Sequence, residues 1–166
     1  MGISGVGKTA LINRLVTGNF STTSPTVAID VRICEIPAKG KGEPTILTFH
    51  DTAGQERFRS ISKPYFRGAD VVLVVVSSRG IQKDLVDCLK WLNEIESEAQ
   101  EAKFILVRTQ IDLVKNRHSG RKRVEEDDEL FPVFGKEENL GETFFDVSSM
   151  EGWGIEELKN YISEVL

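Results

Sequence analysis

A glycine-rich octapeptide near the start of the chain has the residue types and spacing of a phosphate-binding loop. Residues 2–9 (GISGVGKT) match the pattern G-x-x-x-x-G-K-[ST]. Gly5 and Gly7 would let the backbone bend so that successive N–H groups point inward at phosphate oxygens. Lys8 would place a positive charge near the β- and γ-phosphates, and the Thr9 hydroxyl would ligate Mg²⁺. The predicted phosphate-binding residues of this loop are Ser4, Gly5, Val6, Gly7, Lys8 and Thr9. For this motif alone, a glycine-rich turn that matches by chance is the alternative.

A second polar segment, residues 51–56 (DTAGQE), directly follows an apolar stretch that ends at Phe49. Asp51 at the end of a strand could hold Mg²⁺ through a water molecule, and the Gly54 N–H could reach the γ-phosphate. The neutral amide of Gln55 could orient a water molecule for attack on the γ-phosphorus. A turn without chemistry would also accept Asp and Gly, but it would not require this whole hexapeptide.

Composition and length limit the function classes. The 166 residues suit a single domain, 1–166, and 40% of them are hydrophobic. The net charge of −5 argues against a general nucleic-acid binder. Cys34 and Cys88 have no metal-like spacing, which favours a reducing intracellular setting. No apolar run approaches the length of a membrane span, and no signal peptide is visible.

Strand-like and helix-like segments alternate along the chain, which predicts an α/β fold with a mostly parallel sheet and helices on both faces. Continuous β-branched or apolar runs predict buried strands, and apolar residues at helical spacing predict helices. The expected strands are 27–36, 45–49, 71–76, 104–107 and 144–147, with a turn at 37–42 that makes the first two a hairpin. The expected helices are 10–16, 85–95 and 155–162.

A phosphate-binding loop normally follows a buried strand, and only Met1 precedes this one. We therefore expect the usual first strand to be missing from this chain. In a doubly wound sheet that strand would lie in the middle, next to the ligand.

Together, these motifs resemble those of the Rab-like branch of the Ras superfamily of small GTPases. The resemblance covers essentially all residues and is strongest at 2–9, 24–26 (SPT), 51–60 (DTAGQERFRS) and 65–69 (YFRGA). It implies a small G domain with an antiparallel edge hairpin. It also implies that the Thr26 hydroxyl ligates Mg²⁺, so the metal-binding residues would be Thr9, Thr26 and, through water, Asp51. Gly54 joins the phosphate-binding residues, and Gln55 is the expected catalytic residue.

The resemblance also implies a guanine site built from two later segments. Asp112 would accept two hydrogen bonds from the base, and the Ser149 N–H would donate to guanine O6. The expected guanine-binding residues are Thr109, Gln110, Asp112, Ser148, Ser149 and Met150. Gln110 and Met150 stand where the family has lysine, and Asp112 as an ordinary loop acid remains the alternative.

The implied function is that of a GTP-binding switch with slow GTP hydrolysis, with Mg²⁺ as cofactor and GTP and GDP as ligands. Exchange factors, activating proteins and effectors would bind residues 26–31 and 54–68, and a role in vesicle trafficking is implied. His50 replaces a family tryptophan in the effector-reading triad, of which only Tyr65 is kept. We expect no nucleic-acid partner, no lipid anchor in this chain, and a cytoplasmic location unless a lipidated tail is missing.

Two other function classes remain open at this stage. A degenerate G domain that acts as a protein-interaction module would bind nucleotide weakly or not at all, and the missing strand, Gln110 and Met150 favour it. An ATP-dependent enzyme on the same loop would need an adenine pocket, and Asp112 argues for guanine instead. The basic run 115–123 is interpreted as a solvated loop before a helix with acids in its first turn, with a docking surface as the alternative.

Overall fold

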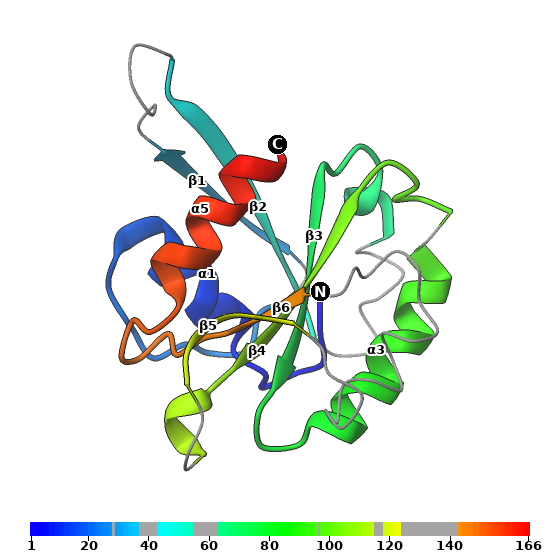
Figure 1. Cartoon of the computed structure of the whole chain (residues 1–166). Coiled ribbons are helices and arrows are strands. Elements are labelled where there is room, and N and C mark those ends of the chain that lie inside the picture. Colours follow the sequence, from blue (N-terminus) through cyan, green and yellow to red (C-terminus); the bar gives the residue numbers. More distant parts are fainter. Residues whose placement is uncertain (28, 37–42, 55–62, 96, 115–117, 124–142) are drawn as a thin grey trace.

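The chain folds into an α/β domain with two β-sheets, as the computed structural model shows (Figure 1). The structure describes residues 1–27, 29–36, 43–54, 63–95, 97–114, 118–123 and 143–166. A two-stranded sheet has the order β1-β2, and a four-stranded sheet has the order β3-β4-β6-β5. The mostly parallel α/β architecture with an antiparallel hairpin, predicted from the sequence, is confirmed.

The hairpin consists of β1 (Ile29–Ile36) and β2 (Thr45–Thr52), which pair in antiparallel fashion with Ile29 opposite Thr52. Its side chains alternate between two faces. Cys34 and Leu47 face the core and are buried, whereas Val31, Ile33 and Ile46 lie on the outer face and are exposed. The second strand runs three residues beyond the predicted end, so that Asp51 and Thr52 belong to it.

The larger sheet is parallel in its centre. The strands β3 (Val71–Ser77), β4 (Lys103–Thr109) and β6 (Thr143–Asp146) run in one direction, and β5 (Gly120–Arg123) pairs antiparallel to β6. The run of β-branched residues in β3 is largely buried, as expected for a strand covered on both faces. The carboxyl ends of β3 and β4 lie side by side, because Ser77 is the partner of Thr109.

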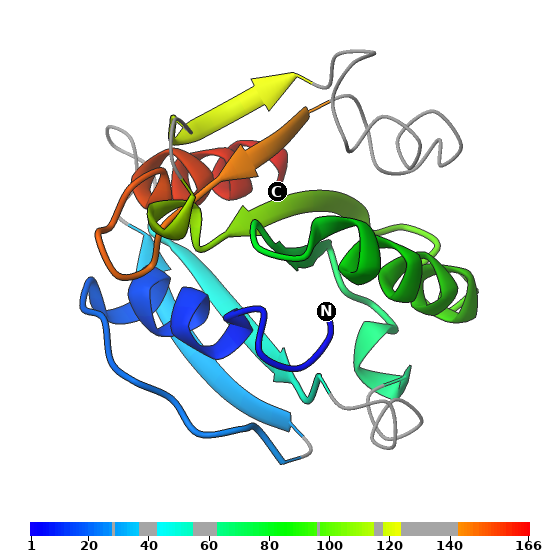
Figure 2. The same cartoon turned by 90° about the horizontal axis from the view of Figure 1, so that it is seen from below.

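Helices cover both faces of the larger sheet (Figure 2). Helix α3 (Ile81–Ile95) packs on one face, where Trp91 and Ile95 join Val72 and Val74 in one core cluster. Helices α1 (Lys8–Thr17) and α5 (Ile155–Val165) pack on the other face around Val107 and Phe145. Two short 3₁₀ helices, Lys63–Phe66 and Ile111–Leu113, complete the described elements. No helix in the described ranges is long and apolar enough to cross a membrane.

One prediction about the basic run is wrong. Residues 120–123 of the supposed solvated loop form strand β5, and the guanidinium of Arg121 lies 4.4 Å from the ring centre of Tyr161 on α5. Pairing with β6 and this cation–π contact stabilise a strand that the composition did not indicate. The turn at 37–42 and the acidic residues that follow the run lie outside the described residues.

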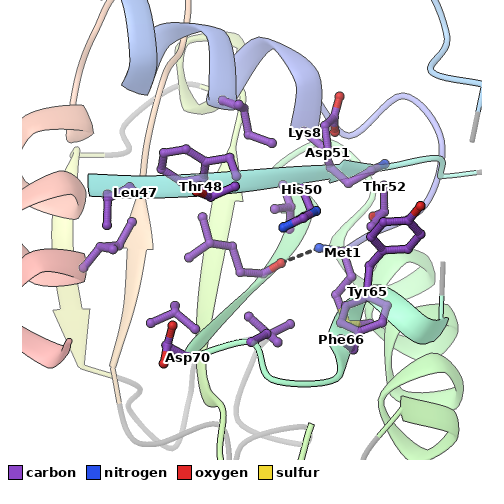
Figure 3. A pocket seen from close by; sticks show the side chains of 18 of the residues that line it. Met1, Lys8, Leu47, Thr48, His50, Asp51, Thr52, Tyr65, Phe66 and Asp70 are labelled. Carbon is purple, nitrogen blue, oxygen red and sulfur yellow. Dashed lines mark hydrogen bonds between the residues drawn. The ribbon is translucent and has the colours of Figure 1, made fainter. Parts of the chain in front are cut away.

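Met1 continues the larger sheet by one residue. Its amino group donates a hydrogen bond to the Leu73 carbonyl (2.6 Å, Figure 3), and its carbonyl accepts one from the Val75 N–H (2.8 Å). These two bonds straddle Val74, as in a parallel ladder. Among the described residues no strand lies between β2 and β3, and the two sheets therefore remain separate there.

Candidate nucleotide site

The loop before α1 has the backbone conformation that its glycines predict. Gly5 and Gly7 have φ angles of +84° and +90°, a left-handed region that disfavours other residues. Gly7 caps α1, and its carbonyl accepts the first helical hydrogen bond from the Leu11 N–H (2.8 Å). The loop therefore leads directly into a helix N-terminus, where backbone N–H groups favour an anion.

Lys8 lies in the wall of this loop with its ammonium held inside the protein. Only 8% of the residue is exposed, and Nζ donates a hydrogen bond to the Ile3 carbonyl at 2.9 Å. Burial lowers the pKa of Lys8 to about 8, although the nearby Asp51 carboxylate opposes this shift. Gly54 passes so close that a Cβ there would collide with the Lys8 ammonium. The close packing brings segments 2–9 and 51–54 together, as the sequence predicts.

Three oxygen-bearing side chains from distant segments converge beside the loop. The Thr9 hydroxyl donates to Asp51 Oδ2 at 2.6 Å and lies 2.8 Å from the Thr26 hydroxyl, which itself lies 3.2 Å from Asp51 Oδ2. Asp51 is 2% exposed, and its other oxygen, Oδ1, is buried without a hydrogen-bond partner among the described residues. A buried carboxylate oxygen without a partner costs free energy.

These three residues fit Mg²⁺. The ion prefers oxygen ligands and takes only one or two from a protein, with waters and phosphates supplying the rest. The orphaned Asp51 Oδ1 would be available to accept a hydrogen bond from a water bound to such an ion. The described part of the chain has no group of three or more His, Cys, Asp or Glu arranged to bind a metal.

Gln110 links the loop to the ends of β3 and β4. Its backbone is left-handed (φ 59°), the Nε2 group donates to the Gly5 carbonyl at 3.2 Å, and Oε1 accepts from the Ser77 hydroxyl at 2.7 Å. The neighbouring Thr109 hydroxyl lies 2.5 Å from the Val6 carbonyl. The side chains of Gln110 and Thr109 therefore hold the backbone of the phosphate-type loop at Gly5 and Val6. The sequence predicted only a guanine-binding role for both residues.

We expect Gln110→Glu to weaken nucleotide binding about tenfold. The substitution keeps the shape and the acceptor for Ser77, but it removes the donor to Gly5 and adds a negative charge beside the phosphate loop. Gln110→Lys serves as the control, because the lysine ammonium is a positively charged hydrogen-bond donor that can replace the amide donor. Its affinity for nucleotide should equal or exceed that of the unaltered protein. Titration with fluorescent GDP measures both, and equal affinities for the two variants would contradict the role of Gln110.

A cavity of about 480 Å³ runs from the loop to the other predicted binding segments. Its size suits a small ligand such as a nucleotide, since ligand pockets span roughly 300–1,000 Å³. From the loop and the segments beside it, it is lined by Ser4, Gly5, Gly7, Lys8, Thr9, Thr26 and Gly54. From the segments predicted to bind guanine and the loop after α1, it is lined by Phe20, Thr109, Gln110, Asp112, Leu113, Ser149 and Met150.

Phe20 is a cavity residue that the sequence reasoning missed. It is 40% exposed and is the one aromatic side chain among the described residues that line this cavity. An aromatic ring at the edge of such a pocket can pack against a purine base. The signal in the sequence was a single phenylalanine within an otherwise polar loop after α1.

Several predicted residues stand behind the cavity wall rather than in it. Val6 and Ser148 are buried and do not line the cavity, and Asp51 lies behind Thr9 and Thr26. The Ser148 hydroxyl accepts a hydrogen bond from the Glu151 N–H at 3.1 Å, which shapes the turn that carries Ser149 and Met150. Gln55, the predicted catalytic residue, lies outside the described residues. The chemical roles assigned to all these residues remain predictions.

The parallel sheet, the phosphate-type loop before α1 and the oxygen cluster beside it define a P-loop nucleotide-binding domain. Comparison with models of known protein families matches residues 1–165 to the model described as the Ras family. The chain therefore belongs to the Ras family, and it is a Rab-like small GTPase of the Ras superfamily.

Curated relatives support this assignment. The chain is 32% identical over 157 residues to Ras-related protein RabC of Dictyostelium discoideum, covering 93% of this chain and 75% of the relative. It is 34% identical over 146 residues to human Ras-related protein Rab-30, covering 86% and 70%. It is 35% identical over 161 residues to the Ras and EF-hand domain-containing protein of Xenopus tropicalis, where 94% of this chain spans 21% of the relative.

Proposed function

We propose that this protein is a guanine-nucleotide-dependent switch that binds GTP and GDP with Mg²⁺ and hydrolyses GTP slowly. The observation that supports this function best is the 480 Å³ cavity, which the phosphate-type loop, Lys8, Asp112 and Phe20 line together. A cavity that has both a phosphate-type loop and a carboxylate with an aromatic ring in its lining fits a nucleoside polyphosphate.

Different residues of the cavity and its surroundings would bind the phosphates, the metal ion and the base. Backbone N–H groups of the loop and the Lys8 ammonium would hold the β- and γ-phosphates, and the Gly54 N–H would contact the γ-phosphate. Thr9, Thr26 and Asp51 would hold Mg²⁺, which when bound supplies neutralising charge between the phosphates. Asp112 would accept hydrogen bonds from the guanine N1–H and 2-amino group, and Phe20 and Met150 would cover the base.

Hydrolysis requires a positioned water rather than covalent chemistry on the protein. Gln55 would orient the attacking water, and we assign no residue of this chain as an arginine finger. The reaction would therefore be slow alone and faster with an activating partner that supplies an arginine or an equivalent group.

The switch would operate through the segments that contact the γ-phosphate. Thr26 and Gly54 begin the stretches 26–31 and 54–68, and loss of the γ-phosphate would remove their contacts to it. Exchange factors, activating proteins and effectors would bind these stretches. A cytoplasmic location and a function in vesicle trafficking belong to the same proposal.

Nucleotide binding tests the proposal directly. Purified protein in millimolar Mg²⁺ should take up fluorescent GDP and GTP saturably, and both should raise the unfolding temperature more than ATP does. EDTA should weaken the binding because it removes the metal. Absence of saturable uptake would overturn the proposal and favour the alternative of a nucleotide-free interaction module.

We expect Gln55→Leu to slow single-turnover GTP hydrolysis about tenfold to 100-fold, because leucine cannot orient the attacking water. GTP affinity should stay within about twofold, since the amide contributes to the transition state more than to binding. Single-turnover release of labelled phosphate measures the rate, and Gln110→Lys is the control. An unchanged rate would exclude Gln55 from the mechanism.

A further inference from the structure

A buried ion pair joins the two neighbouring strands β4 and β6 of the larger sheet (Figure 1). The Arg108 guanidinium donates to both oxygens of the Asp146 carboxylate, from Nε to Oδ1 at 2.6 Å and from Nη2 to Oδ2 at 2.7 Å. Arg108 is 4% exposed and Asp146 is 1% exposed. The function proposed above assigns no role to this pair.

The ion pair lies where the two predicted guanine-binding segments leave the sheet. Arg108 and Asp146 form the last residue pair of the ladder between β4 and β6. Strand β4 ends at Thr109, directly after Arg108, and β6 ends at Asp146 itself. The chain beyond Arg108 carries Asp112, and the chain beyond Asp146 carries Ser149. The relative position of the two strand ends therefore sets where both base-contacting groups begin.

Backbone hydrogen bonds join the two segments directly after the ladder ends. The Val147 N–H donates to the Arg108 carbonyl at 2.9 Å, and the Ile111 N–H donates to the Val147 carbonyl at 3.4 Å. In each bond the donor and the acceptor belong to different strands or to the segments that follow them. Both bonds therefore depend on the register that β4 and β6 keep at the ion pair.

The turn that follows β6 begins and ends beside Asp146. Within it, the Ser148 N–H donates to the Trp153 carbonyl at 3.0 Å. Gly154, at the end of the turn, passes so close that a Cβ there would collide with the Asp146 carbonyl. Because the turn is closed in this way, a displacement of Asp146 would move the Ser149 N–H with it.

Stability alone does not account for a buried pair of this kind. Removing both charges from water costs free energy that their attraction roughly offsets, so apolar residues of similar volume often stabilise a fold equally well or better. An arginine–carboxylate pair contributes geometry, because the planar guanidinium fixes both the distance and the orientation of its partner. The Phe144 ring, whose centre lies 4.7 Å from Arg108 Cζ, supports the guanidinium from one side.

We propose that the Arg108–Asp146 ion pair is a positioning element that sets the preference of the nucleotide site for guanine. This inference rests on the proposed function, since it requires Asp112 and the Ser149 N–H to contact the base. The pair holds the ends of β4 and β6 in one relative position, so that both groups reach the same base together. Neither Arg108 nor Asp146 lines the nucleotide cavity, so the pair acts through these two groups.

The test replaces the pair by apolar residues, Arg108→Met together with Asp146→Leu. Because neither charge is left without its partner, the unfolding temperature should equal or exceed that of the unaltered protein. Fluorescent GDP and ADP in millimolar Mg²⁺ give the ratio of the ADP dissociation constant to the GDP dissociation constant. We expect this ratio to fall about tenfold or more, through weaker GDP binding, with ADP affinity within about twofold of its original value.

The ratio separates a positioning role from a merely structural one. A structural role would weaken GDP and ADP binding equally, so an unchanged ratio in the folded double variant would overturn the inference. If the unaltered protein takes up neither nucleotide, the proposed function fails, and this inference fails with it. GDP uptake by the unaltered protein therefore distinguishes the two failures.

A second variant keeps the test decisive if the double variant does not fold. Arg108→Lys retains a positive charge opposite Asp146 but lacks the planar fork that fixes the carboxylate orientation. Its ratio should fall about threefold, because one charge-assisted hydrogen bond replaces two. The control removes the surface ion pair of α3, Lys90→Met together with Asp87→Leu, and should leave the ratio unchanged. An Arg108→Lys ratio equal to that of the control would overturn the proposal.

Discussion

The variant Lys8→Met is expected to bind GDP and GTP about 1000-fold more weakly than the unaltered protein. The ammonium would donate to oxygens of two phosphates, and hydrogen bonds to charged groups contribute about 1.5–3 kcal/mol each. Loss of two such bonds therefore removes roughly 3–6 kcal/mol, a range that includes 1000-fold. Methionine preserves the length of the side chain, so the loss measures the charge rather than the packing. Fluorescent GDP titration gives the dissociation constants.

The same substitution should not destabilise the nucleotide-free protein. Burial lowers the pKa of Lys8 to about 8, which means that the fold disfavours the charge it carries. An apolar side chain of similar length avoids this desolvation cost, so the unfolding temperature should stay unchanged or rise. Lys90, whose side chain is 67% exposed on α3, provides the control Lys90→Met. A parallel loss of stability and affinity in Lys8→Met would show that the lysine is structural.

Local sequence patterns were sufficient to place the loop, α1 and the buried strands. Gly5 and Gly7 have the positive φ angles that the loop requires, and the β-branched run of β3 is buried as predicted. The convergence of Thr9, Thr26 and Asp51 was also anticipated, although 17 and 42 residues separate Thr9 from the other two. That part of the prediction came from the family resemblance, because composition and periodicity carry no information about long-range contacts.

The role of Gln110 could not be predicted, because it depends on contacts across the fold. Its side chain reaches Gly5, 105 residues earlier, only because its backbone adopts the left-handed conformation at the end of β4. Phe20 was missed for a similar reason. The loop that carries it has no periodicity, and only the folded chain shows that its ring lines the same cavity as Asp112.

Strand β5 was missed because its sequence favours a loop. Residues 120–123 (GRKR) contain no β-branched or aromatic residue, and Gly120 has a φ of +105°. The strand depends on tertiary partners, namely its ladder with β6 and the contact of Arg121 with the Tyr161 ring. Here tertiary contacts override intrinsic propensity, a common limit of single-sequence reasoning.

The largest change in nucleotide preference is expected from Asp112→Asn. Asp112 stands in the first turn of the 3₁₀ helix Ile111–Leu113 and lines the same cavity as Lys8. Its carboxylate would accept from both guanine donors, whereas an asparagine amide accepts one hydrogen bond and directs its NH₂ group at the guanine 2-amino group. Because the asparagine NH₂ group and the guanine 2-amino group are both donors, no hydrogen bond forms between them. One hydrogen bond is lost, and the guanine 2-amino group is left without an acceptor. We expect GDP affinity to fall about 1000-fold.

Xanthosine diphosphate separates this specific effect from general damage. Its base carries a carbonyl in place of the 2-amino group, so an asparagine NH₂ can donate to it. Asp112→Asn should therefore bind xanthosine diphosphate more tightly than GDP, whereas the unaltered protein should show the opposite order. Asp70→Asn, an exposed carboxylate that does not line the nucleotide cavity, should leave the order unchanged. Equal weakening toward both nucleotides would mean that Asp112 supports the loop without contacting the base, and guanine selectivity would then have to come from the turn that carries Ser149.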